Sequence, residues 1–127
     1  MDKYIVLAIG GSIGTILRYL TGVYSAKILG ADFPYGTLIV NTVGSFILSF
    51  FMILFLEKLS LDPLWRLFIA VGFCGSYTTM SSFTYETLGL LMDGDYIKAG
   101  LNIFLNVFLS FASAFLGIVF ARILLWK

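Results

Sequence analysis

Four long apolar runs, separated by short polar stretches, dominate the hydropathy pattern of the chain. The runs cover residues 4–17 (continuing past Arg18 to 26), 33–56, 67–85 and 99–121. A helix that crosses a membrane needs about 20 predominantly apolar residues, so each run can supply one. The pattern predicts an all-α membrane protein with four transmembrane helices, in a single domain that takes up residues 1–127.

The third run is interrupted by polar residues between positions 72 and 86. Six of these fifteen residues are Ser or Thr, and Gly72 and Gly75 stand three apart. In hydrocarbon every backbone and hydroxyl group needs a partner, so such a stretch is stable only where protein or a water-filled path surrounds it. We therefore expect the third helix to be broken and to line something polar.

Small and polar residues recur every four positions on the other predicted helices, which places each set on one helix face. The sets are Gly10, Gly14, Arg18 and Gly22; Thr37, Asn41, Ser45 and Ser49; and Asn102, Asn106 and Ser110. Glycines at this spacing allow membrane helices to approach each other closely. The polar sets have two interpretations, as hydrogen bonds between helices or as neutral groups along an ion path.

Three side chains have both a structural and a functional interpretation. Asn41 has two N–H donors, which either join helices or donate to an anion. Phe83 either packs in the core or turns its positive ring edge toward an anion. Arg18 either extends to the membrane interface or attracts anions into a vestibule. Glu86 is expected near the interface, in a packing or capping role.

The composition narrows the classes of function. The 127 residues are 60% hydrophobic and 12% charged, with no histidine and a single cysteine, Cys74. A zinc or redox site is therefore not expected. The chain has no nucleophile–base pair, phosphate-binding glycine loop or basic patch for nucleic acid, so an enzyme is not expected either. A line of neutral donors suits a channel for a small hydrated ion of either sign. Four helices are few to enclose a pore, so we expect a dimer.

Positive charges are distributed almost evenly between the two ends of the predicted helices. Lys3, Lys58, Arg66, Arg122 and Lys127 would lie on one side, and Lys27 and Lys98, with Arg18, on the other. This bias sets the orientation in the membrane. Five against three leaves two alternatives, insertion mainly one way or insertion both ways to form an antiparallel dimer.

Three motifs in this order resemble those of the bacterial Fluc (CrcB) fluoride channels over essentially the whole chain. The first comprises Gly10, Gly11, Gly14, Arg18 and Tyr19. The second comprises Pro34, Gly36, Thr37, Leu38, Val40, Asn41 and Gly44. The third comprises Gly72, Phe73, Gly75, Thr78, Thr79, Ser81, Phe83 and Glu86.

The resemblance implies an antiparallel, dual-topology homodimer in the bacterial inner membrane, with two pores for passive fluoride export. It implies a structural sodium ion at the dimer centre, bound by the backbone carbonyls of Gly75 and Thr78. The fluoride pathway it implies comprises Asn41, Met80, Ser81, Phe83, Asn106 and Ser110. The vestibule or supporting residues comprise Arg18, Thr37, Glu86 and Asn102. The expected partners are fluoride, sodium, the second copy and the bilayer, with no nucleic acid.

Met80 departs from the family pattern, because it stands where the first of two pore phenylalanines belongs. The rest of the motif is intact, so we take an engineered substitution as the hypothesis and a natural variant as the alternative. Met fills space but has no aromatic edge, so we expect the fold and dimer to survive with lower fluoride throughput. Two rivals remain, a small dual-topology drug exporter, which needs a carboxylate in its first helix, and a non-transporting membrane scaffold.

Overall fold

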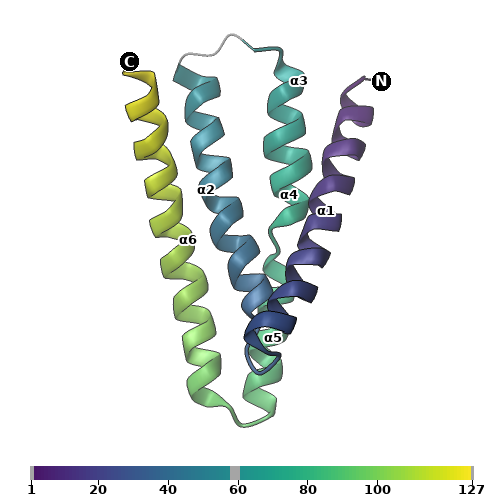
Figure 1. The fold of residues 1–127 in the computed structure, drawn as a ribbon, viewed down its shortest axis with the longest axis vertical. Coiled ribbons are helices and arrows are strands. Elements are labelled where there is room, and N and C mark those ends of the chain that lie inside the picture. The colour runs from purple at the N-terminus through teal and green to yellow at the C-terminus, as the bar shows by residue number, and fades with distance from the viewer. Residues whose placement is uncertain (1, 58–60, 127) are drawn as a thin grey trace.

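The computed structural model describes residues 2–57 and 61–126, and within that part the chain is helical with no strand (Figure 1). The elements are α1 (Asp2–Leu29), α2 (Tyr35–Glu57), α3 (Pro63–Arg66), η1 (Leu67–Cys74), α4 (Gly75–Tyr77), α5 (Met80–Met92) and α6 (Tyr96–Leu125). The predicted all-α class is confirmed. Lys58, in the loop expected after the second run, and Lys127 lie outside the described residues.

Three of the helices, α1, α2 and α6, are each long and apolar enough to cross a membrane. The helices α1 and α6 contain the first and fourth apolar runs and extend a few residues beyond them. The helix α2 starts two residues inside the second run and ends one residue after it. The third run is divided among η1, α4 and α5, with α3 directly before it and with Thr78 and Thr79 outside any helix. The predicted break is therefore present, and it lies after both Gly72 and Gly75.

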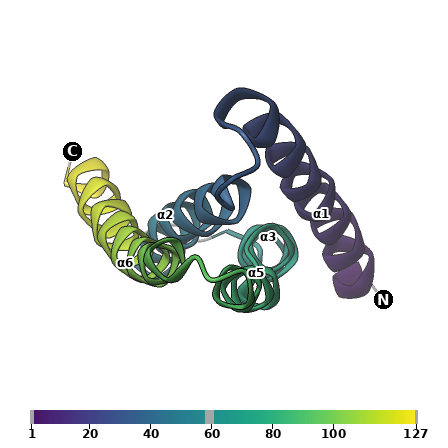
Figure 2. The same cartoon turned by 90° about the horizontal axis from the view of Figure 1, so that it is seen from below.

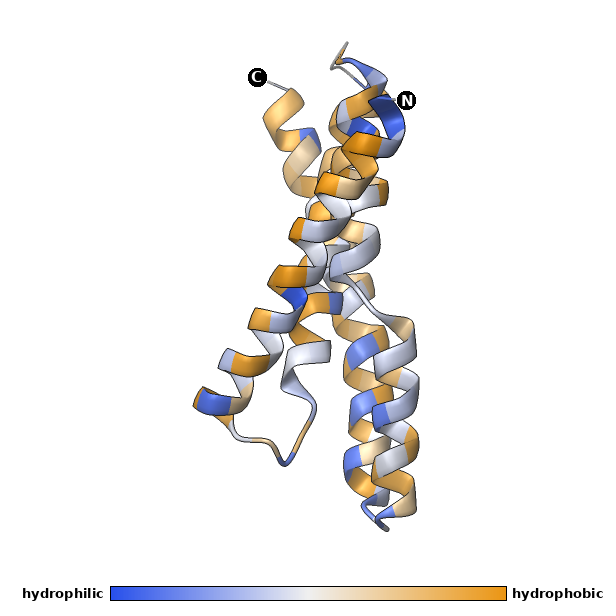
Figure 3. Cartoon of the chain, turned by 90° about the vertical axis from the view of Figure 1, so that its right-hand side faces the viewer, coloured by the Kyte–Doolittle hydropathy of each residue, from blue (hydrophilic) through white to orange (hydrophobic). Residues whose placement is uncertain are grey.

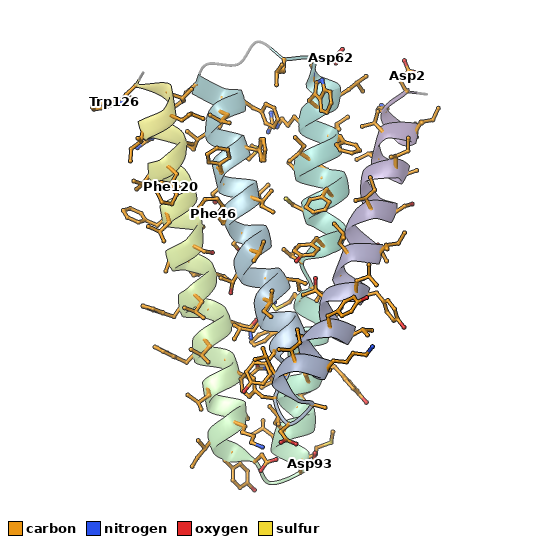
Figure 4. All side chains as sticks on the ribbon, viewed as in Figure 1. Asp2, Phe46, Asp62, Asp93, Phe120 and Trp126 are labelled. Atoms are coloured by element: carbon orange, nitrogen blue, oxygen red, sulfur yellow. The ribbon has the colours of Figure 1, made fainter. Side chains whose placement is uncertain are left out.

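The start of α1, the end of α2, the start of α3 and the end of α6 lie at one end of the molecule, and the α1–α2 and α5–α6 connections lie at the opposite end (Figure 1). Figure 4 labels Asp2, Asp62 and Trp126 at the first end and Asp93 at the other. This arrangement agrees with the assignment of charged residues to two sides. Seen along the helices, α1 and α6 lie at opposite edges, with α2 and the divided segment between them (Figure 2).

Local signals explain where the divided segment starts. The Asp62 carboxylate accepts a hydrogen bond of 2.9 Å from the amide of Leu64, and Pro63 occupies the first helical position, where a missing N–H costs nothing. The next eight residues, η1, form a π-helix with wider turns than an α-helix. Such geometry is rare and often lies near functional sites. The sequence pattern did not predict it.

Small residues allow the helices to approach closely. A Cβ at Gly10 would lie 2.7 Å from the carbonyl oxygen of Phe68, and one at Gly117 would lie 2.6 Å from that of Phe46. Phe46 also packs against Phe120 of α6, with ring centroids 5.9 Å apart (Figure 4). The contact between α1 and η1 therefore depends on Gly10, and the contact between α2 and α6 depends on Gly117 and on a tilted ring pair.

Most large apolar side chains face outward, as expected of a chain surrounded by lipid. Figure 3 shows hydrophobic positions along most of the helices and hydrophilic positions near the ends. Further hydrophilic positions lie midway along the helices and in the half that contains α5. Buried polar side chains include Thr37, Thr87, Asn102 and Asn106. The buried polar side chains thus lie beside the break and in the half of the molecule that contains α5.

Candidate functional site

The break consists of two extended residues between α4 and α5. Thr78 has φ −81° and ψ 158°, and Thr79 has φ −153° and ψ 115°. The Thr79 hydroxyl accepts a hydrogen bond of 3.1 Å from the amide of Ser82 and so caps the N-terminus of α5. The chain therefore leaves the helix for two residues and restarts at a capping side chain.

Asn41 of α2 pairs with the backbone of Thr79 through both ends of its carboxamide. Its Oδ1 accepts from the Thr79 amide at 2.8 Å, and its Nδ2 donates to the Thr79 carbonyl at 3.2 Å. An extended residue loses its helical partners, and at membrane depth those groups need replacements. Asn41 supplies them, so the predicted hydrogen bonding between helices is present at this residue.

The carbonyls of Gly75 and Thr78 lose their normal helical donors at the break. In an α-helix the Thr79 amide would donate to Gly75, and the Ser82 amide to Thr78. In this structure the Thr79 amide donates to Asn41 and the Ser82 amide to the Thr79 hydroxyl. Neutral oxygens suit hard cations such as sodium, so the chemistry of these two carbonyls fits the predicted ion.

Arg18 of α1 approaches the break from the other side. Its Nε donates to the carbonyl of Ser76 at 3.0 Å, at the end of α4. A positive charge is favourable at the C-terminus of a helical segment. Arg18 also lines a hollow of about 590 Å³, which we call the Arg18 cleft. Its lining residues include Thr15, Arg18, Tyr19, Gly36, Thr37, Thr79 and Ser82.

Glu86 and Thr37 connect α5 to the first turn of α2. The Thr37 hydroxyl donates to the Glu86 carboxylate, which places a negative charge beside the N-terminus of α2, where it is favourable. Glu86 lines a cavity of about 210 Å³ that includes Thr37 and Gly36, two residues of the Arg18 cleft. The contact joins two side chains, and the packing or capping role of Glu86 stays a prediction.

A second hollow, of about 380 Å³, lies between α2, α6 and the break. We call it the Asn41 groove. No charged side chain is among its lining residues. They are Asn41, Gly44, Ser45, Leu48, Ala70, Cys74, Gly75, Thr78, Thr79, Met80, Phe83, Asn106, Val107, Ser110 and Phe111.

The Asn41 groove brings together most of the predicted pathway. Asn41, Met80, Phe83, Asn106 and Ser110 all line it, and so do the two predicted sodium ligands. The remaining pathway residue, Ser81, lines neither hollow, and its hydroxyl lies 3.3 Å from that of Thr79. Asn102 is fully buried behind Asn106.

Two residues near these hollows were missed by sequence reasoning. Phe111 lines the groove next to Ser110 and is 75% exposed. Thr87 is buried, and its hydroxyl accepts a hydrogen bond of 2.9 Å from Asn102. Phe111 does not belong to the Asn102–Asn106–Ser110 repeat of α6, and Thr87 follows the third run, in which hydroxyl residues are common. The partner of Thr87 becomes visible only once α5 and α6 are packed together.

Comparison with known proteins agrees with the three sequence motifs described above. The family model described as CrcB-like protein, Camphor Resistance (CrcB), matches residues 5–118. A Sulfurihydrogenibium sp. (strain YO3AOP1) protein named fluoride-specific ion channel FluC is 78% identical, over 98% of this chain and all of the relative.

Two proteins with the same name are also similar, at lower identity. The one from Koribacter versatilis is 40% identical over 87% of this chain and 88% of its own length. The one from Shewanella oneidensis is 41% identical over 97% of this chain and all of its own. With a family match that covers most of the residues and identities at this level, the chain belongs to the CrcB-like family.

Proposed function

We propose that this chain is a fluoride channel, which exports fluoride by passive electrodiffusion through two pores of an antiparallel, dual-topology homodimer in the bacterial inner membrane. The observation that carries the proposal is the Asn41 groove, an uncharged hollow beside a helix break whose backbone is hydrogen-bonded by Asn41. The name of the relatives, fluoride-specific ion channel, supports the choice of ion. The divided third segment adds one crossing to those of α1, α2 and α6, so that the chain crosses the membrane four times.

A second copy is part of the proposal because the groove is incomplete in one chain. Met80 is 72% exposed and Phe111 75% exposed beside the groove. Two carbonyls, those of Gly75 and Thr78, are too few ligands for a sodium ion that takes several oxygens, and an antiparallel copy would supply two more. Bound sodium would add a positive charge at the centre and hold the two breaks together.

Fluoride would reach the groove by way of the Arg18 cleft, with Thr37 and Glu86 beside the entrance. A cleft that carries one sign of charge raises the local concentration of the opposite ion. Thr79 lines both hollows and therefore lies at the step between them. Ser81 lies beside Thr79, and Ser110 continues the groove along α6.

Asn41 must exchange a hydrogen bond to bind the anion. Its amide nitrogen donates to the carbonyl of Thr79 and to Oδ1 of Asn106, at 3.0 Å. An anion is a stronger acceptor than a neutral oxygen, so fluoride can replace either one. Binding is then favourable but readily reversed, which is the requirement for conduction. The ring edge of Phe83 would add a weak attraction on the same wall.

The rival functions have less support. A drug exporter of the dual-topology kind needs a carboxylate within its first helix, and the acid of α1 is Asp2, in the first turn. A scaffold would use its polar groups as hydrogen bonds between helices alone. The contacts of Asn41 and Asn106 fit that role, but an uncharged groove beside freed carbonyls is not needed for it.

Efflux from proteoliposomes tests the proposed function. Vesicles loaded with potassium fluoride and containing the purified chain are diluted into fluoride-free potassium-poor buffer, and released fluoride is read with an ion-selective electrode. A channel should release fluoride only after valinomycin allows potassium to balance the charge. Release without valinomycin would indicate a proton-coupled exchanger, and no release with valinomycin would favour the scaffold.

A further inference from the structure

Four side chains form a continuous chain of hydrogen bonds from the break to the interior of α5. Asn41 donates to Asn106, and Asn106 Nδ2 donates to Asn102 Oδ1 at 2.9 Å. Asn102 donates to the Thr87 hydroxyl at 2.9 Å, and that hydroxyl donates to the Phe83 carbonyl at 2.7 Å. We call Asn41, Asn106, Asn102 and Thr87 the amide relay.

Backbone groups fix the direction of every bond in the relay. The Thr79 amide can only donate, so the atom of Asn41 that faces it is Oδ1. Asn106 Nδ2 also donates to the Asn102 carbonyl at 2.9 Å, and a carbonyl can only accept. The Phe83 carbonyl likewise fixes the proton of Thr87. Inverting one carboxamide would bring two donors or two acceptors together.

The relay begins and ends on α5 and its cap. It starts at Thr79, passes through α2 and α6, and returns to the carbonyl of Phe83, one turn into α5. It therefore fixes the first turn of α5, which carries the groove residues Met80 and Phe83, against two other helices. Hydrogen bonds linked in this way polarise one another, so loss at one end weakens the other.

Thr87 and Asn102 are buried and line neither hollow, so they can act on the path only through their neighbours. Thr87 is 6% exposed and Asn102 is 0% exposed, and neither lines the Asn41 groove or the Arg18 cleft. Without Thr87, the buried amide of Asn102 would lack its acceptor and would turn to find another. Asn102 Oδ1 accepts from Asn106 Nδ2, so a turn of the Asn102 amide would disturb the side chain of Asn106.

We propose that Thr87 and Asn102 are positioning residues for anion selection, because they hold Asn106 with its oxygen toward Asn41 and so keep the Asn41 amide aimed along the groove. The inference rests on the proposed fluoride conduction. The two residues act on the ion without touching it, so their loss should change which anion passes as well as how fast it passes.

The test uses three variants of α5 in the full chain. Thr87→Val keeps the shape of the side chain and removes the hydroxyl, and Thr87→Ser keeps the hydroxyl. Thr84→Val is the matched control, because the Thr84 hydroxyl also donates to a carbonyl of its own helix, at 2.9 Å, but is exposed and outside the relay. Valinomycin-dependent efflux is measured for fluoride and for chloride, and dimer assembly by size-exclusion chromatography.

We expect Thr87→Val to lower fluoride efflux about tenfold and to raise chloride efflux relative to fluoride, with Thr87→Ser and Thr84→Val close to wild type. Equal efflux in Thr87→Val and Thr84→Val would overturn the inference. So would a slower Thr87→Val with an unchanged fluoride-to-chloride ratio, since that result indicates a purely structural role.

Two further outcomes are decided by additional measurements. If Thr87→Val does not assemble, the double variant Thr87→Val/Asn102→Leu removes both partners together, which is tolerated better than leaving one unpaired. The double variant should assemble and show the altered ratio, and an unaltered ratio would overturn the inference.

If the wild-type chain does not conduct fluoride, the proposed function fails and this inference fails with it. If the wild type conducts, the variants test the relay alone.

Discussion

The Arg18 cleft and the Asn41 groove lie on opposite sides of one helix break and differ in charge. The cleft contains the guanidinium of Arg18, which also donates to the carbonyl of Ser76. The groove contains amides, hydroxyls and aromatic rings but no charged side chain. Thr79 is the residue that the two lining sets share. The two hollows are therefore neighbours with separate chemistry.

The difference suggests a division of tasks along the path. A fixed positive charge attracts an anion from a distance, but a charge deep in a narrow path would hold the ion too tightly for conduction. Neutral donors can replace the water shell of the ion and then release it. Charge near the entrance and neutral groups in the groove are the combination that the proposed function needs.

The largest effect is expected from a charge placed in the groove. Asn41→Asp keeps the size of the side chain, but one carboxylate oxygen would face the Thr79 carbonyl and Asn106 Oδ1, both of which are acceptors. The negative charge would also repel the anion. We expect fluoride efflux to fall by about a hundredfold or more. Efflux near the wild-type rate would mean that the ion does not pass Asn41.

A smaller loss of fluoride efflux is expected when a methyl group is added at Gly44, where the groove wall contacts the break. A Cβ at Gly44 would overlap the side chain of Thr78 and approach Tyr77 at 3.4 Å. Overpacking of this kind costs about 1–3 kcal/mol, so Gly44→Ala should slow fluoride efflux about tenfold or prevent assembly. Gly100→Ala is the control, because a Cβ there meets no atom within 4 Å. Equal efflux in the two variants would contradict the close packing of the break.

A several-fold loss of fluoride efflux, which depends on salt concentration, is expected when the charge of the Arg18 cleft is removed. Arg18→Gln removes the charge, so fluoride efflux should fall at low ionic strength and recover partly at high salt, where charges are screened within about 10 Å or less. Arg18→Lys keeps the charge but not the planar Nε that donates to Ser76. An efflux rate of Arg18→Lys as low as that of Arg18→Gln would assign Arg18 to the support of the break and not to attraction.

The smallest effect is expected at position 80, where a substitution should increase fluoride efflux. Met80→Phe adds a third ring to the groove, which Phe83 and Phe111 already line. We expect fluoride efflux to rise by about two- to threefold, given the modest energy of such contacts. Phe111→Leu is the companion variant, since it removes an edge on the opposite wall. If Met80→Phe conducts no faster than wild type, a ring edge at this site is not required.

The positions of the helices and of the break could be predicted because both depend on neighbouring residues. Apolar runs mark helices, and a cluster of Ser and Thr in one run marks the interruption. The repeat of four correctly placed Asn102 and Asn106 on one face, where their side chains meet. The same reasoning left the partner of Asn41 open between a helix and an ion.

The remaining features depend on how the helices pack together. The pairing of Asn41 with both backbone groups of Thr79 requires that α2 lie beside the break at one height, which no local pattern specifies. The contact between Thr87 and Asn102 depends on the rotation of α5 relative to α6. The π-helical turns of η1 have no sequence signal that we recognise.

The most direct test of the account compares the selectivity of one variant from each hollow. Fluoride and chloride efflux are measured in the same proteoliposomes for wild type, Arg18→Gln and Asn41→Ser. If the charged cleft attracts and the neutral groove selects, Arg18→Gln will slow both anions and keep their ratio, while Asn41→Ser will shift the ratio toward chloride. A shifted ratio in Arg18→Gln with an unchanged ratio in Asn41→Ser would contradict the account.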